Sequence, residues 1–207
     1  MIERRRALLI AAGAAWLAPW QAAQAGAQIE EPLADAVRGA LAAAVADNAP
    51  PKPSFERMDD RLAYLRWLGT MSDRLKKRKS EALTRIEFLE ALWYESKRAG
   101  LEPALVLGLV QVESAFRKYA ISKAGARGYM QVMPFWVKLI GQPGHNLFHL
   151  RTNLAYGCAV LRFYLDVEKG DYYRALGRYN GSLGQPEYPN LVLAAWRGRW
   201  KYDGPIG

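Results

Sequence analysis

The chain has 207 residues, of which 51% are hydrophobic and 24% are charged, and its formal net charge is +9. This composition excludes an intrinsically disordered chain, and the length fits one domain or one domain with a helical extension. The excess of positive charge predicts attraction to anionic surfaces.

The first 25 residues have the three-part layout of a secretory signal. A basic start, MIERRR, precedes an apolar run of 12 residues, and an A-x-A site follows at residues 23–25. The run is shorter than the roughly 20 apolar residues that span a bilayer. We therefore expect an exported protein of the periplasm or cell envelope whose mature chain begins at Gly26. Arg5 and Arg6 loosely resemble a twin-arginine signal, so the export route stays open.

Residues 26–83 predict an N-terminal helical extension. An Ala-rich helix is expected over 31–47, and a proline-rich break follows at 48–54. Residues 55–78 predict an amphipathic helix, and the basic run KKRK at its end is interpreted as a solvated last turn. Apolar residues at spacings of three and four should form its buried face: Leu62, Leu65, Leu68, Met71 and Leu75.

Helices are also predicted for most of the remaining chain. Thr84 and Glu87 match a capping box, so a helix is expected over 85–99, and Gly100 should end it. Residues 117–129 contain three glycines and predict a loop with a short hairpin. Four further helices are expected. The first runs over Pro134–Ile140, the second is capped by Asn153 and reaches Glu168, and the third is capped by Asp171 and reaches Arg178. The fourth begins at Pro189, and its inward-facing residues should be Leu191, Val192 and Trp196.

Glu113 is the residue where chemistry is expected. It ends an apolar segment that begins at Pro103 and reads as a buried helix, and from Ser114 to Leu165 the chain has seven Lys or Arg and no acid. Burial raises the pKa of a carboxyl, and a carboxylic acid that is protonated near neutral pH is what a glycosidic oxygen needs from a general acid. Helical periodicity alone favours the alternative, an ion pair with Arg117 one turn later.

Four motifs in order extend this hypothesis. Glu113-Ser114 is followed by Ser122, and then by Gly128-Tyr-Met-Gln131. The pattern Asn-x-x-x-Gly occurs at residues 153–157, and Ala-x-x-x-Tyr-Asn at residues 175–180. With this spacing the sequence resembles the lytic transglycosylases of the soluble-lytic-murein-transglycosylase (SLT) type over about residues 84–198. The resemblance implies a mostly α, lysozyme-like helical domain at residues 84–200.

The resemblance also implies roles for individual residues. Glu113 would be the catalytic acid and then base. Ser122, Gln131 and Met133 would line the cleft beside the N-acetylated sugar, Tyr179 would lie close to the glutamate, and Asn180 would support the cleft wall. The implied reaction cleaves the β-1,4 bond between N-acetylmuramic acid and N-acetylglucosamine in peptidoglycan glycan strands, with a 1,6-anhydro product and with one carboxylate. A monomer without cofactor, metal or nucleic-acid partner is expected.

Three positions depart from the family pattern. Tyr129 stands where Leu is usual, Gly181-Ser182 follows the Tyr-Asn pair, and His149-Leu150 stands where Asp-Pro often precedes the next helix. These departures concern the shape of the cleft, and Tyr129 in particular could widen it or stack there. Two other functions stay open: hydrolysis of the same bond by a goose-type lysozyme-like enzyme, and a non-catalytic wall-binding or secretion-associated role.

Some residues have simpler interpretations. Ser114 is expected to bond back to its own helix, and Cys158 is expected to be buried packing. His145 and His149 lie four residues apart, but no nearby Cys or acid completes a metal site, so surface histidines are expected.

Overall fold

The computed structural model describes Leu41 and residues 52–142 and 144–205. The predicted secretory signal, the helix over 31–47 apart from Leu41, and most of the proline-rich break lie outside the described residues. Within them the chain is helical, which confirms the mostly α class. The helices are α2 (Met58–Leu75), α3 (Ala82–Arg98), α4 (Pro103–Ser114), α5 (Pro134–Ile140), α6 (Leu150–Val167), α7 (Tyr172–Asn180) and α8 (Glu187–Arg197).

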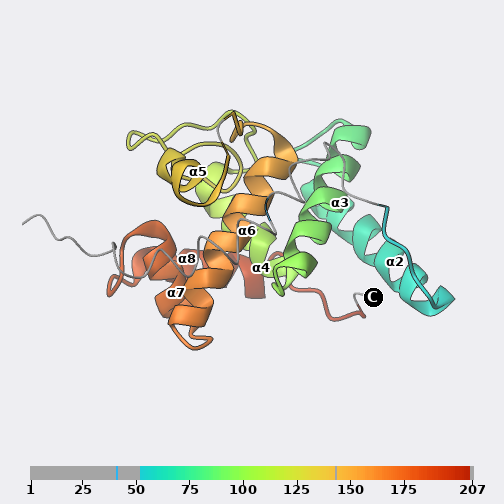
Figure 1. Ribbon diagram of the computed structural model, residues 1–207. Coiled ribbons are helices and arrows are strands. Elements are labelled where there is room, and N and C mark those ends of the chain that lie inside the picture. The colour runs from blue at the N-terminus through green and yellow to red at the C-terminus, as the bar shows by residue number, and fades with distance from the viewer. Residues whose placement is uncertain (1–40, 42–51, 143, 206–207) are drawn as a thin grey trace, which may run out of the picture.

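Helix α4 forms the centre of the molecule. Figure 1 shows it behind α6, with α2 and α3 on one side and α7 and α8 on the other. Its residues from Ala104 to Val110 are buried, as expected from a segment that is apolar nearly all round. Gly108 lets α8 approach closely, because a Cβ at this position would lie 2.9 Å from the backbone nitrogen of Trp196. This close contact between α4 and α8 brings the end of α4 to the start of α8.

Helix α2 buries a different stripe from the one predicted. Leu68, Met71 and Leu75 are buried as expected, but Leu62 and Leu65 are 42% and 48% exposed. Aromatic residues, Tyr64 and Trp67, take their places in the core. The helix buries these two aromatic residues in place of the two leucines because an aromatic side chain removes more apolar surface from water than a leucine does. None of the helices in the described part of the chain has the length and apolar character needed to span a bilayer.

The ends of α2 and α3 also differ from the prediction. Helix α2 ends at Leu75, so the basic run follows the helix, and Lys79 is half-buried with its Nζ donating to the Tyr129 hydroxyl at 2.9 Å. The N-cap of α3 is Glu81, whose carboxylate accepts from the backbone N–H groups of Leu83 and Thr84. The predicted capping box at Thr84 was therefore wrong, because the helix begins at Ala82 and Thr84 lies inside its first turn.

Asn153 does not cap α6, because the helix begins at Leu150 and Asn153 lies within it. Its fully buried amide accepts from the Met130 N–H and donates to the carbonyls of Arg127 and Leu147, each at 2.8 Å. Asn153 thus holds the loop at residues 127–130 against α6. That loop carries the isolated bridges Ile121–Arg127 and Arg127–Val132, which correspond to the predicted hairpin.

The remaining predictions about the C-terminal half have mixed outcomes. Asp171 caps α7 as expected, by accepting from the Arg174 N–H, and Cys158 is fully buried. Helix α8 begins at Glu187, two residues before Pro189. Val192 is buried, but Leu191 is 59% exposed, so its inward orientation was predicted wrongly.

Candidate active site

Glu113 lies in the last turn of α4 and is half-buried. The hydroxyl of Tyr188 donates to Glu113 Oε1 at 2.5 Å. Tyr188 belongs to the first turn of α8, so the packing of α8 on α4 joins two residues that are 75 positions apart in the sequence. The carboxyl is therefore both removed from water and held by a phenol.

Burial raises the pKa of Glu113 from 4.5 to about 7, and the hydrogen bond from Tyr188 opposes this rise in part. No second carboxylate is among the causes of this shift. The ion pair with Arg117 does not form in the described part of the chain: Arg117 is exposed, and its Nε donates to the Ser114 carbonyl at 3.0 Å. Glu113 can therefore carry a proton near neutral pH, as a general acid must.

Ser114, next to the glutamate, bonds within the protein as predicted. Its hydroxyl oxygen lies 3.2 Å from the Val110 carbonyl and 2.7 Å from the Tyr129 carbonyl. The residue thus ties the end of α4 to the loop that carries Gln131. Its role is to join two backbone segments.

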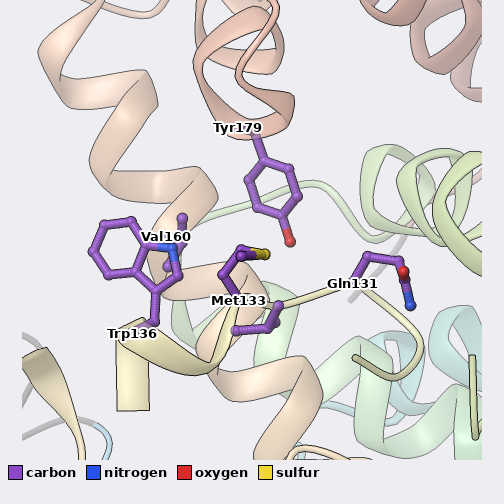
Figure 2. Close-up of a pocket in the computed structure, with 6 residues that line it drawn as sticks. Gln131, Met133, Trp136, Val160 and Tyr179 are labelled. Carbon is purple, nitrogen blue, oxygen red and sulfur yellow. The ribbon is translucent and has the colours of Figure 1, made fainter. Parts of the chain in front are cut away.

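A small cavity brings together three of the residues predicted from the motifs, Gln131, Met133 and Tyr179. Figure 2 shows the Tyr179 hydroxyl pointing toward Met133, with Trp136 and Val160 on the far side. The Tyr179 hydroxyl donates to the Met130 carbonyl at 2.8 Å and not to the Glu113 carboxylate. Burial raises the pKa of Tyr179 well above its ordinary value, and the nearby negative charge of Glu113 raises it further. Tyr179 is therefore near the glutamate, but it supports the Met130–Gln131 backbone.

Gln131 has a left-handed backbone, with φ of 49°. Its side-chain nitrogen donates to the carbonyls of Ala120 and Gly128, at 3.1 Å and 2.9 Å. The two donor hydrogens of this amide are thus committed to the loop, and its acceptor oxygen is the part suited to a substrate N–H or O–H.

Ser122 and Asn180 do not line this cavity. The Ser122 hydroxyl accepts from the Ala126 N–H at 3.1 Å and stabilises the hairpin turn. Asn180 is the last residue of α7 and is exposed. The structure therefore groups Gln131, Met133 and Tyr179 at one cavity. The roles of all five residues stay predictions.

Tyr129 does not widen or stack in the cleft. It is 2% exposed, its ring lies 4.9 Å from that of Phe88, and its hydroxyl accepts the Lys79 hydrogen bond. The larger side chain is accommodated by α3 and the segment after α2. His145 Nδ1 lies 2.6 Å from the Tyr156 hydroxyl, so this histidine is engaged within the fold.

Tyr188 is the residue that the sequence analysis missed. Its only local signals are Pro186 and Pro189, which mark a helix start but do not indicate what the tyrosine contacts. The partner depends on how closely α8 approaches α4, which no short-range pattern encodes.

Comparison with known proteins shows which family the residues around this site resemble. Residues 91–188 match the family described as the transglycosylase SLT domain. A protein named transglycosylase from Enterobacteria phage PRD1 is 35% identical over 128 residues, which are 58% of this chain and 47% of the phage protein. Membrane-bound lytic murein transglycosylase C of Actinobacillus pleuropneumoniae serotype 5b (strain L20) is 50% identical over 48 residues, 23% of this chain and 13% of that protein.

The chain thus spans about half of the phage protein and a smaller part of the second relative. Among solved structures, an inactive mutant of the lytic transglycosylase Slt from Pseudomonas aeruginosa aligns with 70% of this chain and 26% of its own, at 24% identity and a TM-score of 0.42.

Proposed function

We propose that the protein is a lytic transglycosylase of peptidoglycan, because residues 91–188 of this chain match the transglycosylase SLT family. It cleaves the β-1,4 bond between N-acetylmuramic acid and N-acetylglucosamine. The observation that carries this proposal is the Glu113 carboxyl, whose pKa burial raises to about 7 and which Tyr188 holds at 2.5 Å. The relatives named lytic murein transglycosylase support the same activity.

In the first step Glu113 gives its proton to the glycosidic oxygen as the bond from this oxygen to C1 of the muramyl sugar breaks. The muramyl acetamido group stabilises the cationic C1. In the second step the Glu113 carboxylate takes the proton from the C6 hydroxyl as its oxygen bonds to C1, which closes a 1,6-anhydro ring. The glutamate ends protonated, as it began, and no water is consumed. One carboxylate suffices because the acetamido group of the substrate takes the place of the second carboxylate, as in substrate-assisted glycosidases.

The other site residues have proposed roles in binding. Gln131 accepts a hydrogen bond from the sugar through its amide oxygen, and Met133 forms an adaptable apolar floor. Tyr179 fixes the Met130–Gln131 backbone that presents both. Ser122 and Asn180 lie outside the small cavity, and their proposed place is at the edge of the wider sugar-binding cleft.

The organisation and location of the protein follow the sequence predictions. Residues 84–200 form the transglycosylase domain, residues 26–83 form the helical extension, and residues 1–25 are removed on export to the periplasm or cell envelope. Relatives named membrane-bound lytic murein transglycosylase fit that location. The protein acts as a monomer on glycan strands.

Digestion of purified sacculi with identification of the products by mass tests this function. The proposal expects products lighter by one water than those of hydrolysis. Products of full mass would instead support a goose-type lysozyme-like hydrolase, and binding of sacculi without cleavage would support a non-catalytic wall-binding role.

The Glu113→Gln variant should lose nearly all activity while keeping its helicity. Removal of a general acid costs about 10² to 10⁴ in rate, and here the same residue also acts as the base. Glu102→Gln is the matched control, because Glu102 is the N-cap residue at the other end of the same helix. A second folded carboxamide variant as inactive as Glu113→Gln would contradict the one-carboxylate mechanism.

A further inference from the structure

The backbone immediately after Glu113 adopts a conformation that needs support. Ala115 and Phe116 are consecutive non-glycine residues in the left-handed region, with φ of 50° and 65°. This region is unfavourable for residues with a Cβ, and such residues persist where surrounding contacts hold them, often at functional sites. The sharp turn ends α4 one residue after Glu113, so whatever holds the turn also fixes the glutamate's backbone.

Phe116 is the residue through which the fold holds this turn. It is 3% exposed, and its ring lies 5.8 Å from that of Phe88 and 5.4 Å from that of Trp200. The guanidinium of Arg78 lies 5.9 Å from the centre of the same ring. Three separate segments therefore pack on one side chain.

Trp200 also contacts the other side of Glu113. It is fully buried, and its indole N–H donates to Gln111 Oε1 at 3.1 Å. Gln111 precedes the glutamate by two residues and Phe116 follows it by three. A single indole therefore contacts the chain on both sides of Glu113, once within α4 and once in the turn that follows it.

Trp200 is itself held in place by α2. Arg74 Nη1 donates to the carbonyls of Arg199 and Lys201, at 3.0 Å and 2.6 Å, and Arg199 Nη2 donates to the Arg74 carbonyl at 2.5 Å. Figure 1 shows the C-terminal tail, in red, leaving α8 and running toward α2. Arg74, Phe88 and Trp200 all lie outside the residues that match the family, 91–188.

We propose that Trp200 is a positioning residue for Glu113: by bonding Gln111 and packing on Phe116, it fixes the end of α4 so that the carboxyl stays against Tyr188. This inference rests on the proposed function and assigns a role to α2, which braces the tail. Loosening the helix end would let the carboxyl reach water, and the burial that raises its pKa would be lost in part.

The test compares Trp200→Phe with Trp67→Phe in the full chain. Both residues are fully buried tryptophans, but the Trp67 indole N–H has no partner in the described residues. Trp67 lies on α2 seven positions before Arg74, the residue of that helix that bonds the tail. Both variants should lose thermal stability. Only Trp200→Phe should lower kcat, by about ten- to a hundredfold, because a displacement of about 1 Å can cost 10²-fold, and KM should change less than twofold.

Titration of Glu113 by carbon-13 NMR of its carboxyl supplies a readout that does not need activity. The pKa should fall toward 4.5 in Trp200→Phe and stay near the wild-type value in Trp67→Phe. Gln111→Met removes the acceptor of the same hydrogen bond, should reproduce the shift, and should add little to it in the double variant. If Trp200→Phe does not fold, Gln111→Met tests the same hydrogen bond in its place.

The inference is overturned if Trp200→Phe and Gln111→Met lower the melting temperature, but kcat stays within twofold of the wild-type value and the pKa of Glu113 does not shift. A wild-type protein that does not cleave sacculi would contradict the proposed function, and the titration would still decide whether Trp200 positions Glu113.

Discussion

The Glu113 side chain is subject to two opposing influences, and burial prevails. Seven basic residues and no acid occur between Ser114 and Leu165, which would favour the carboxylate if those charges lay close. The structure directs Arg117 to a backbone carbonyl and keeps it exposed. The carboxyl keeps its proton up to about pH 7 because of its position in the fold, since desolvation is the largest cause of the rise in its pKa.

Activity should fall as pH rises through about 7, because Glu113 must be protonated to begin the reaction and its pKa is about 7. This fall is the high-pH limb of the pH profile, and it is measured from the pH dependence of kcat/KM on soluble glycan strands. A limb that fell near pH 4.5 would mean that the carboxyl is hydrated in solution.

The same shift predicts how stability depends on pH. The folded pKa of about 7 lies above the ordinary 4.5, so the folded state holds the proton more tightly, and this contribution is lost as pH rises through 7. Glu113→Gln keeps a neutral side chain, and its melting temperature should exceed the wild-type value at pH 8 by more than at pH 4. An equal difference at both pH values would contradict the assigned pKa.

The two tyrosines near Glu113 should behave differently on substitution. Tyr188→Phe removes a hydrogen bond that lowers the Glu113 pKa, so the falling limb of the pH profile should move to higher pH. Tyr179→Phe removes a bond to the Met130 carbonyl, so turnover should fall while the limb stays in place. Profiles of both variants under the same conditions make the comparison. If the falling limb moved in Tyr179→Phe and not in Tyr188→Phe, Tyr179 and not Tyr188 would be the residue that contacts the carboxyl.

Among the helices, α3 and α6 are joined by a buried ion-pair network. Glu95 of α3 is fully buried and accepts from Arg98 at 2.7 Å and from Arg151 of α6 at 3.1 Å. A carboxylate in the core is stable only while its partners remain, because removing one leaves a buried charge that is incompletely compensated. The network therefore joins two helices that pack on each other, and Figure 1 shows one of them, α6, in front of α4.

Arg151→Met should therefore lower the free energy of unfolding by about 3 kcal/mol, the low end for a broken buried pair, because Arg98 remains beside Glu95. Arg162→Met is the control, since the ion pair of Arg162 with Asp166 is largely exposed and should contribute about 0–1 kcal/mol. Chemical denaturation measures both. Equal losses in the two variants would show that the buried network adds nothing beyond a surface pair.

For the protein as a whole, the net positive charge should assist its encounter with an anionic polymer. This charge is +9 for the full chain and +7 without residues 1–25, which carry three Arg and one Glu. Raising the salt from about 0.05 M to about 0.5 M shortens the screening length roughly threefold, so KM on sacculi should rise while kcat changes little. Clearing rates measure this, with uncharged chito-oligosaccharides as the control substrate. The same salt dependence on that substrate would contradict electrostatic attraction.

The sequence by itself determined the elements whose signals are local. The apolar run after Pro103, the glycine stop at Gly100 and the cap at Asp171 each act over a few residues, so they predicted helices close to where the structure has them. The same reasoning located Glu113 at the end of a buried helix. The spaced motifs predicted five substrate-binding residues, and the fold brings three of them, Gln131, Met133 and Tyr179, to one cavity.

Only the tertiary structure decided which groups bond to one another. Tyr188 contacts Glu113 because Gly108 lets α8 approach α4, and Trp200 contacts Gln111 because Arg74 holds the tail. Such pairs are 75 to 127 residues apart, and the choice among them depends on how whole helices pack, which side-chain periodicity does not specify. The raised pKa of Glu113 belongs to the same class, since burial is a property of the assembled helices and not of the residues beside it in the chain.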